Sequence, residues 1–465
     1  MSVTCDGTAR RPNIVFLLAD QWRASATGYA GDTNVRTPNI DRLATQSVNF
    51  RNAVSVCPVC TPYRAALMTG RYPTSTGMFL NDLHLPATEL CMAEIFGRAG
   101  YRTAYIGKWH LDGHGRETYI PPERRQGWDY WKAAECDHSY LHSHYYEGNS
   151  PDKRYWAGYD AFAQTAEARR LLREYRTDPR PFLLFVSYGT PHFPHFELPP
   201  GYDTLYVADR IKLPPNVPPD LQERARKEAT GYYAHCEALD RCVAEIMATL
   251  DETGLANDTI LVFTSDHGEM MGSHGCTPYT KQVPWSESAC VPLLIRAPGV
   301  SARSVTAPIN TPDLLPTLLG MAGIRQPRTM EGDDLSALVR GGREMPDRAA
   351  LYMLVSPFHG NKAYDMEYRA IRTRTHTYVR NITGPWLLYD DERDPYQMRN
   401  LIGAPGHDSL RADLDRRVQT ELDRIGDPFH PRRYYLTKFG YEIASHGSIS
   451  YAPGARPQSP DRRAR

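Results

Sequence analysis

The feature that most restricts the fold is a series of short apolar runs, each separated from the next by an amphipathic segment. Such runs, rich in Val, Ile and Leu, are typical of strands buried on both faces of a parallel sheet. The segments between them keep apolar residues three or four positions apart, as helices do. We predict strands over 13–19, 102–106, 182–187, 259–264 and 291–295, and helices that include 161–175 and 224–253. The alternation predicts an α/β fold in which one large, mostly parallel or mixed sheet is sandwiched by helices.

The pattern changes near residue 347, so we expect more than one domain in a chain of 465 residues. The stretches "YRAIRTRTHTYVRN" and "PWLLYDDERDPYQMRNLI" are interpreted as two extended segments joined by "ITG", which predicts an antiparallel hairpin. We divide the chain into a catalytic domain over 1–345, an α+β subdomain with an antiparallel sheet over 346–451, and a flexible tail over 452–465. An aromatic-rich insertion at about 128–160 is expected either as a tyrosine-rich loop or as a wall of the substrate pocket.

The overall composition excludes several kinds of partner. Lys and Arg total 54 and so do Asp and Glu, so the chain has no global charge that would attract nucleic acid. No segment approaches the roughly 20 apolar residues that a membrane helix needs. The apolar run near the N-terminus is expected to be a buried strand rather than a signal peptide, and the nine scattered cysteines to be reduced thiols. We therefore expect a cytoplasmic protein that binds neither nucleic acid nor membranes.

Polar residues follow four of the predicted strands. Because ligands bind beyond the carboxyl ends of parallel strands, we expect these side chains to meet at one edge of the sheet. Two carboxylates, an amide oxygen and an imidazole from this set suit a divalent cation, and two further histidines suit proton transfer. Arg64, Lys108 and Lys281 would add positive charge, which favours a tetrahedral oxyanion as substrate. The strand-end residues are Asp20 and Gln21, Lys108 and His110, His192, and Asp266 and His267.

Cys60 belongs to two patterns that predict different chemistry. With Cys57 it forms a C-x-x-C pair, which is typical of a redox dithiol or half of a zinc site. It also opens "CTPYR" at the start of a predicted helix, where the helix dipole favours an anion or an activated nucleophile. Arg64 then lies one helical turn further along the same face.

These residues together resemble the formylglycine-dependent sulfatases of the alkaline phosphatase-like superfamily. The family signature C-x-P-x-R matches Cys60, Pro62 and Arg64, and its usual extension is present as "AALMTGRYP". The resemblance continues, in family order, through "RPNIVFLLADQ", "TPNIDRLA", "GYRTAYIGKWHL", "TPHFPHF", "SDHGEMMGSHG" and "CVPLLIRAPG". It covers nearly the whole chain except the insertion and the tail, and it implies the alkaline phosphatase-like fold.

The resemblance implies a role for each matching residue. Cys60 would be converted to formylglycine by a formylglycine-generating enzyme, and the hydrated aldehyde would supply the nucleophile for hydrolysis of a sulfate monoester. Arg64 would stabilise that nucleophile, Lys108 and Lys281 would bind sulfate oxygens, and His110 and His192 would transfer protons. The divalent cation would be held by Asp20, Gln21, the modified Cys60, Asp266 and His267.

Two departures from the commonest family pattern leave the metal and the reaction open. Gln21 and His267 stand where most members carry Asp and Asn, so calcium is expected but manganese and magnesium stay alternatives. The same Gln and His pair occurs in relatives that cleave phosphonate monoesters and phosphodiesters, which is the main enzymatic alternative. Those relatives tend to lack the G-K-x-H element present here at Gly107, Lys108 and His110. A catalytically dead binding protein and a C-x-x-C redox or zinc protein would each also fit part of the sequence.

The motifs do not specify the organic part of the substrate. Aromatic residues of the insertion would suit stacking on a sugar or aryl group, so we expect a carbohydrate or small organic sulfate bound by Trp131, Tyr145 and Trp156. The tyrosine-rich C-terminal region would suit burial in a homo-oligomer.

Overall fold

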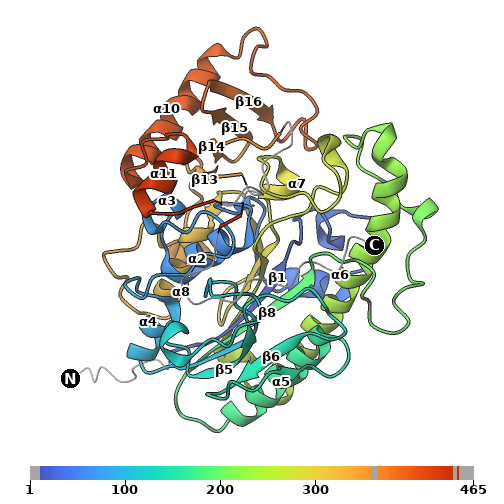
Figure 1. Cartoon of the computed structure of the whole chain (residues 1–465), viewed down its shortest axis with the longest axis vertical. Helices are drawn as coiled ribbons and strands as arrows, with labels where there is room; N and C mark the ends of the chain where they lie inside the picture. The colour runs from blue at the N-terminus through green and yellow to red at the C-terminus, as the bar shows by residue number, and fades with distance from the viewer. Residues whose placement is uncertain (1–10, 358–363, 444–447, 450–465) are drawn as a thin grey trace, which may run out of the picture.

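A computed structural model describes residues 11–357, 364–443 and 448–449. Its largest element is a ten-stranded sheet in the order β11-β2-β10-β9-β1-β8-β4-β5-β6-β7. Figure 1 shows helices on both sides of this sheet and a smaller C-terminal sheet above it. The predicted α/β architecture is therefore confirmed, and so is the presence of a separate antiparallel sheet.

The centre of the large sheet is parallel. Four predicted strands are confirmed, and each extends beyond its predicted carboxyl end. The fifth, β10, begins at Leu293 instead of 291 and pairs antiparallel with β9. Pro292 has no N–H to donate, which explains why the ladder starts one residue after it. The parallel strands are β1 (Asn13–Asp20), β4 (Arg102–Lys108), β5 (Tyr130–Ala134), β8 (Phe182–Pro191) and β9 (Thr259–Ser265), and β10 covers Leu293–Arg296.

Alternate residues of β1 enter two different hydrophobic cores, as expected for a strand covered on both faces. Phe16 and Leu18 pack on one side, and Leu17 and Ala19 on the other. The first core includes α2 (Cys60–Thr69), α4 (Met92–Arg98) and α8 (Thr311–Met321), and the second includes α1 (Pro38–Ala44), α5 (Asp160–Tyr175) and α6 (Gln222–Glu252). Within the described ranges, no helix is both long and apolar enough to cross a membrane.

The insertion predicted over 128–160 forms one edge of the large sheet rather than a loop. After β5, the chain continues into β6 (His144–Glu147) and β7 (Arg154–Tyr155), which pair antiparallel. Its aromatic side chains therefore divide between the two faces of a sheet edge. The opposite edge is made by β2 (Val48–Phe50) and β11 (Arg303–Val305).

The C-terminal sheet has four antiparallel strands, so the predicted two-segment hairpin is incomplete. The stretch over 368–381 folds back on itself, because the Thr373 hydroxyl accepts hydrogen bonds from the N–H groups of Thr375 and His376. The strands are β13 (Ala350–Leu354), β14 (Tyr368–Arg372), β15 (His376–Asn381) and β16 (Gly384–Asp390). The helices α10 (Asp408–Ile425) and α11 (Arg432–Phe439) follow, and α10 packs on β14 and β15. Shorter elements are α3 (Pro73–Thr76), α7 (Ser286–Ala289), α9 (Ser336–Val339) and the pair β3 (Ala53–Val54) and β12 (Ile309–Asn310).

The C-terminal sheet is hydrogen-bonded to two segments of the large domain. One leads to the start of α2, and the other follows Lys281. Met353 N–H donates to Val56 O at 2.8 Å, four residues before Cys60. The Tyr352 hydroxyl donates to Pro284 O at 2.8 Å. The small sheet thus helps to position two loops that carry chemically important residues. The predicted tail over 452–465 lies outside the described residues.

A buried ion pair in the C-terminal sheet gives a stability prediction. Arg369 Nε lies 2.6 Å from Asp427 Oδ2 with both side chains fully buried, and Tyr435 also donates to Asp427. Asp427→Ala should lower the free energy of unfolding by about 3–5 kcal/mol, because it leaves a guanidinium buried without its partner. Urea unfolding followed by tryptophan fluorescence measures this change. The exposed pair of Asp413 with Arg416 is the control, and an equally small loss in Asp427→Ala and Asp413→Ala would contradict the prediction.

Candidate active site

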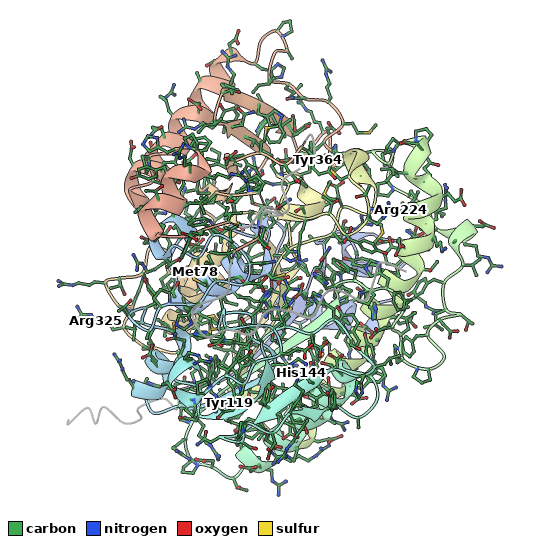
Figure 2. All side chains as sticks on the ribbon, viewed as in Figure 1. Met78, Tyr119, His144, Arg224, Arg325 and Tyr364 are labelled. Carbon is green, nitrogen blue, oxygen red and sulfur yellow. The ribbon has the colours of Figure 1, made fainter. Side chains whose placement is uncertain are left out.

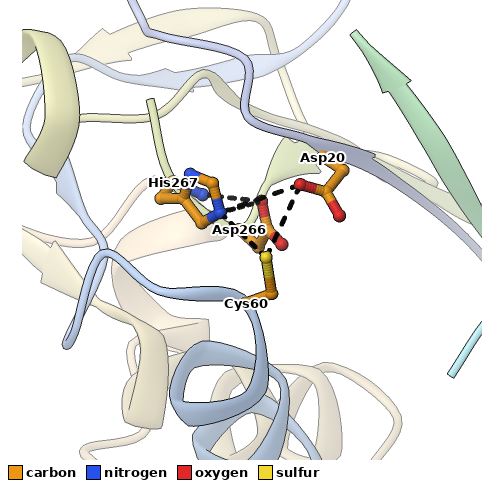
Figure 3. Close-up of side chains that lie close together, drawn as sticks. All are labelled: Asp20, Cys60, Asp266 and His267. Carbon is orange, nitrogen blue, oxygen red and sulfur yellow. Dashed lines mark hydrogen bonds and ion pairs between the residues drawn. The ribbon is translucent and has the colours of Figure 1, made fainter. Parts of the chain in front are cut away.

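The carboxyl ends of β1 and β9 meet the first residue of α2 at one edge of the sheet. Asp20 ends β1, Asp266 and His267 follow β9, and Cys60 begins α2. One ligand atom from each of these four side chains lies within 4.8 Å of the others, and Figure 3 shows the side chains facing one another. The sulfur of Cys60 is 3.2 Å from His267 Nε2 and 3.8 Å from Asp20 Oδ1. The predicted convergence of strand-end residues is thus present in the structure.

Gln21 follows Asp20 directly, and its amide oxygen has no hydrogen-bond partner among the residues that the structure describes. Its backbone lies in the left-handed region, with φ of 67°, and its N–H donates to Asp266 Oδ1 at 3.0 Å. The side-chain nitrogen donates to Glu269, which fixes the amide orientation. Oε1 is buried and accepts no hydrogen bond from the described residues. A buried acceptor of this kind calls for a ligand, and together with the two carboxylates and the imidazole of the cluster it makes a donor set that fits a divalent cation.

Arg64 carries a fully buried positive charge beneath the cluster. It lies one turn after Cys60 in α2, and its Nη2 is 3.2 Å from Asp20 Oδ2 and 3.4 Å from Asp266 Oδ2. Burial and Cys60 would raise the pKa of Asp20, but Lys108, His192 and Arg64 outweigh them and hold it below its usual value. For Asp266, burial and the neighbouring Asp20 raise the pKa. The two carboxylates therefore share one guanidinium and need further positive charge to stay ionised together.

Two lysines place positive charge on Cys60. Lys281 Nζ lies 3.1 Å from the sulfur, and Lys108 Nζ lies 4.0 Å from it and 2.6 Å from Asp20 Oδ2. Burial alone would raise the pKa of Cys60, but Lys108, Lys281 and His267 together lower it well below the usual thiol value. A group that carries negative charge at position 60 is therefore stabilised. Lys281, a residue predicted from its place in a loop of variable length, lies directly in the cluster.

His192 joins the site from the loop after β8. Its Nε2 lies 3.0 Å from Lys281 Nζ, and its Nδ1 lies 2.8 Å from Phe193 O. Because a carbonyl only accepts, Nδ1 carries the proton and Nε2 accepts from Lys281. Burial and the charge of Lys281 lower the pKa of His192 to about 3. Burial and the neighbouring cation thus both favour the neutral ring.

His110 is held by an acid that the sequence did not single out. Its Nε2 lies 3.0 Å from Asp82 Oδ1, and Asp82 also accepts from Arg116 Nε at 3.0 Å and Nη2 at 2.9 Å. His110 Nδ1 is buried and has no hydrogen-bond partner among the described residues. Burial would lower the pKa of His110, but the charges of Cys136 and Asp82 and a contact with Cys60 raise it to about 9. Asp82 and His110 both have φ near 60°, a strained backbone that sequence patterns do not reveal.

His138 is a second residue that sequence reasoning missed. It follows β5, and its ring stacks on that of His192 with centroids 4.3 Å apart. Burial and the surrounding cations lower its pKa well below the usual value, so it offers a neutral imidazole beside the pocket. Recognition of residues 130–134 as another strand of the parallel sheet would have placed His138 at the same edge as the other site residues.

The predicted substrate-binding aromatic residues lie elsewhere. Trp131 is 1% exposed and packs on Tyr105 and Trp109 in the core, so its assignment to the pocket is wrong. It points inward because alternate side chains of β5 face opposite sides of the sheet. Tyr145 of β6 and Trp156, the residue after β7, pack against each other near the amino group of Lys132. Figure 2 labels His144, the first residue of β6. The contact of Tyr145 and Trp156 with a substrate stays a prediction.

Comparison with known proteins assigns this site to a family. The sulfatase family model matches residues 12–324, and the model for the N-sulphoglucosamine sulphohydrolase C-terminal region matches residues 272–424. The chain belongs to the sulfatase family. An ulvan-active sulfatase of Formosa agariphila is 51% identical over 434 residues, which are 93% of this chain and 85% of that protein. The chain is therefore classed as a sulfuric ester hydrolase.

Two further proteins support the sulfatase assignment. An endo-4-O-sulfatase of Bacteroides thetaiotaomicron is 30% identical over 93% of this chain and 96% of its own length. A solved structure of a Bacteroides fragilis protein assigned as the yidJ sulfatase has a TM-score of 0.83 and 29% identity. The structural match covers 93% of this chain and 100% of the Bacteroides fragilis chain. Such neighbours have the alkaline phosphatase-like fold, as the resemblance implied.

The carboxylate behind His110 gives a prediction about catalysis. Asp82→Asn should lower kcat of this sulfatase on an aryl sulfate by about 10- to 100-fold, because Asn keeps an acceptor oxygen but removes the negative charge that pairs with the His110 ring and orients it. KM should change little, since the carboxylate of Asp82 binds His110 and Arg116 and acts on the site through the His110 ring. Steady-state kinetics measures both constants. Asp178→Asn, which perturbs the pair with Arg102 at the opposite end of β4, is the control, and an Asp82→Asn enzyme that changes only in KM would contradict the prediction.

Proposed function

We propose that this sulfatase hydrolyses sulfate monoesters carried on carbohydrates, with residue 60 as formylglycine and with one divalent cation. The observation that carries the proposal is the position of Cys60, which starts a buried helix and lies within reach of cation ligands, Lys281 and Lys108. Position 60 is thus where a nucleophile, a cation and a sulfate ester would meet.

Five residues would hold the cation: Asp20, Gln21, Asp266, His267 and the modified Cys60. The cation would polarise oxygen at position 60 and supply the charge that the two carboxylates lack. We propose calcium, since most of these ligands are oxygen atoms, with manganese or magnesium as alternatives. The orphaned Oε1 of Gln21 supports its inclusion.

Formylglycine, made from Cys60 by a formylglycine-generating enzyme, would supply in hydrated form a hydroxyl group that attacks sulfur. Arg64 would hold negative charge near that group through its guanidinium, and Lys108 and Lys281 would donate to the sulfate oxygens. In its neutral form His110 would accept a proton at Nδ1, the atom that has no partner in the described protein, and its raised pKa makes that form a strong base.

His192 would protonate the leaving alcohol. Its Nε2 accepts from Lys281, and the negative charge of a bound sulfate would raise the basicity of the ring. The proton on Lys281 can then reach the leaving oxygen through His192. This route uses groups already in contact and requires no movement of the sheet.

The carbohydrate part of the proposal is supported by the relatives. The Formosa agariphila protein is named for its activity on ulvan, a polysaccharide. The match to it covers 93% of the present chain. We therefore propose a sulfated polysaccharide fragment as substrate.

A phosphonate monoester hydrolase is the second candidate, because Gln21 and His267 fit the pattern of such relatives. Lys108 and His110 favour the sulfatase, since both lie beside Cys60. The test compares kcat/KM for an aryl sulfate, an aryl phosphonate and an aryl phosphodiester. We expect a clearly higher kcat/KM for the aryl sulfate. Lys108→Ala should lower that kcat/KM more than Lys212→Ala, a substitution at the surface, does. Faster turnover of either phosphorus substrate would reverse the assignment.

Cation binding gives a prediction that does not depend on turnover. Calcium added at about 100 times its Kd should stabilise the fold by about 2.7 kcal/mol and raise Tm, because it binds only the folded site. Asp20→Asn should remove most of this shift. The described residues contain a second metal-capable group, His84 with Asp112 and His114, so His114→Gln is the control and should keep the full shift. If His114→Gln loses the Tm shift and Asp20→Asn keeps it, calcium binds at His84, Asp112 and His114 and the prediction is contradicted.

A further inference from the structure

Two loops run side by side from the sulfate pocket to the surface. At the inner end, His138 of one loop stacks on His192 of the other with ring centroids 4.3 Å apart. At the outer end, Leu141 N–H lies 3.4 Å from the carboxylate of Glu197. Between them, the Tyr140 hydroxyl lies 2.7–3.0 Å from three carbonyl oxygens, those of Gly189, His192 and Phe193. The pair of loops is therefore a fixed extension of the pocket.

The outer end carries apolar side chains that are not packed into the protein. Phe196 is 78% exposed, the highest value among the large hydrophobic residues that the structure describes, and Leu141 is 43% exposed. Tyr155, 48% exposed, stacks on His142 at 4.1 Å and so continues the same surface. We call Leu141, Tyr155 and Phe196 the exposed strip.

We propose that the exposed strip binds the sugar rings next to the sulfated sugar, so that the protein prefers a polysaccharide chain to a single sulfated unit. This inference rests on the proposed function. The strip begins only four residues beyond His192, a path of at most about 14 Å, so the neighbouring sugars of a bound chain would reach it.

The chemistry of the strip fits a sugar better than a protein. A sugar ring has an apolar C–H face and a hydroxyl edge, and the strip sets apolar side chains beside the polar groups of Glu197 and His142. A stable protein interface uses roughly 20–30 residues on each side, and the exposed strip offers far fewer. The strip also differs from the predicted residues Trp131 and Trp156, which are almost fully buried.

The test is Phe196→Ala assayed on two substrates. For ulvan oligosaccharides of several sugars, kcat/KM should fall about tenfold, since the ring loses its stacking surface. For a small aryl sulfate, kcat/KM should stay unchanged, because that substrate ends before the strip. Phe196→Trp should restore activity on the oligosaccharide, and Met398→Ala, at a 59% exposed residue of the C-terminal region, is the matched control. An equal loss on both substrates, or no loss on either, overturns the proposal.

A binding measurement separates this inference from the proposed function. In the Cys60→Ala background, calorimetry with the same oligosaccharides should show affinity about tenfold weaker after Phe196→Ala. If the wild type hydrolyses no sulfate ester, the proposed function fails whatever the calorimetry shows. If it does hydrolyse them and Phe196→Ala binds the oligosaccharides as tightly as its parent, the exposed strip has no such role.

Discussion

A single buried charge, the guanidinium of Arg64, connects the site to the fold. It is 1% exposed and has ion-pair partners on two strands, Asp20 of β1 and Asp266 after β9. The same guanidinium donates to Lys108 O at the end of β4 and to the Ser187 hydroxyl in β8. A charge this deep is tolerated only if its donors are well engaged, so α2 and four strands must meet in one arrangement. Cys60, one turn earlier on the helix, is placed by that requirement.

Charged side chains gather in the site, although the chain as a whole has no net charge. Lysines and arginines equal the acids in number, yet Arg64, Lys108 and Lys281 converge on the two carboxylates and the sulfur of Cys60. A cation would add further positive charge to this cluster, which suits an anionic substrate and the further negative charge of a transition state. The selectivity for anions is therefore local and arises from burial rather than from net charge.

Much of the fold and part of the site could be predicted from sequence, for a physical reason. Strands buried on both faces leave continuous apolar runs, and parallel strands bring their carboxyl ends to one edge. Asp20, Asp266, His267 and Cys60 were therefore found together, with Lys281 beside them. Their catalytic roles stay predictions, since position alone does not establish a role.

Other residues leave no such signal. Asp82 contacts His110 from a backbone position in the left-handed region, whereas its neighbours in sequence resemble an ordinary turn. Trp131 was placed in the pocket because its segment is aromatic, but the alternation of β5 turns it into the core. The exposed strip depends on which aromatic residues face solvent, a property that composition does not encode.

The cation ligands and both lysines of the site surround the sulfur of Cys60. The most direct measurement is a tandem mass spectrum of the tryptic peptide over 52–64, from protein made together with a formylglycine-generating enzyme. The account predicts that Cys60 has lost its thiol and carries an aldehyde, while Cys57, buried and with its pKa raised, keeps its thiol. Two intact thiols, or a disulfide between Cys57 and Cys60, would contradict it.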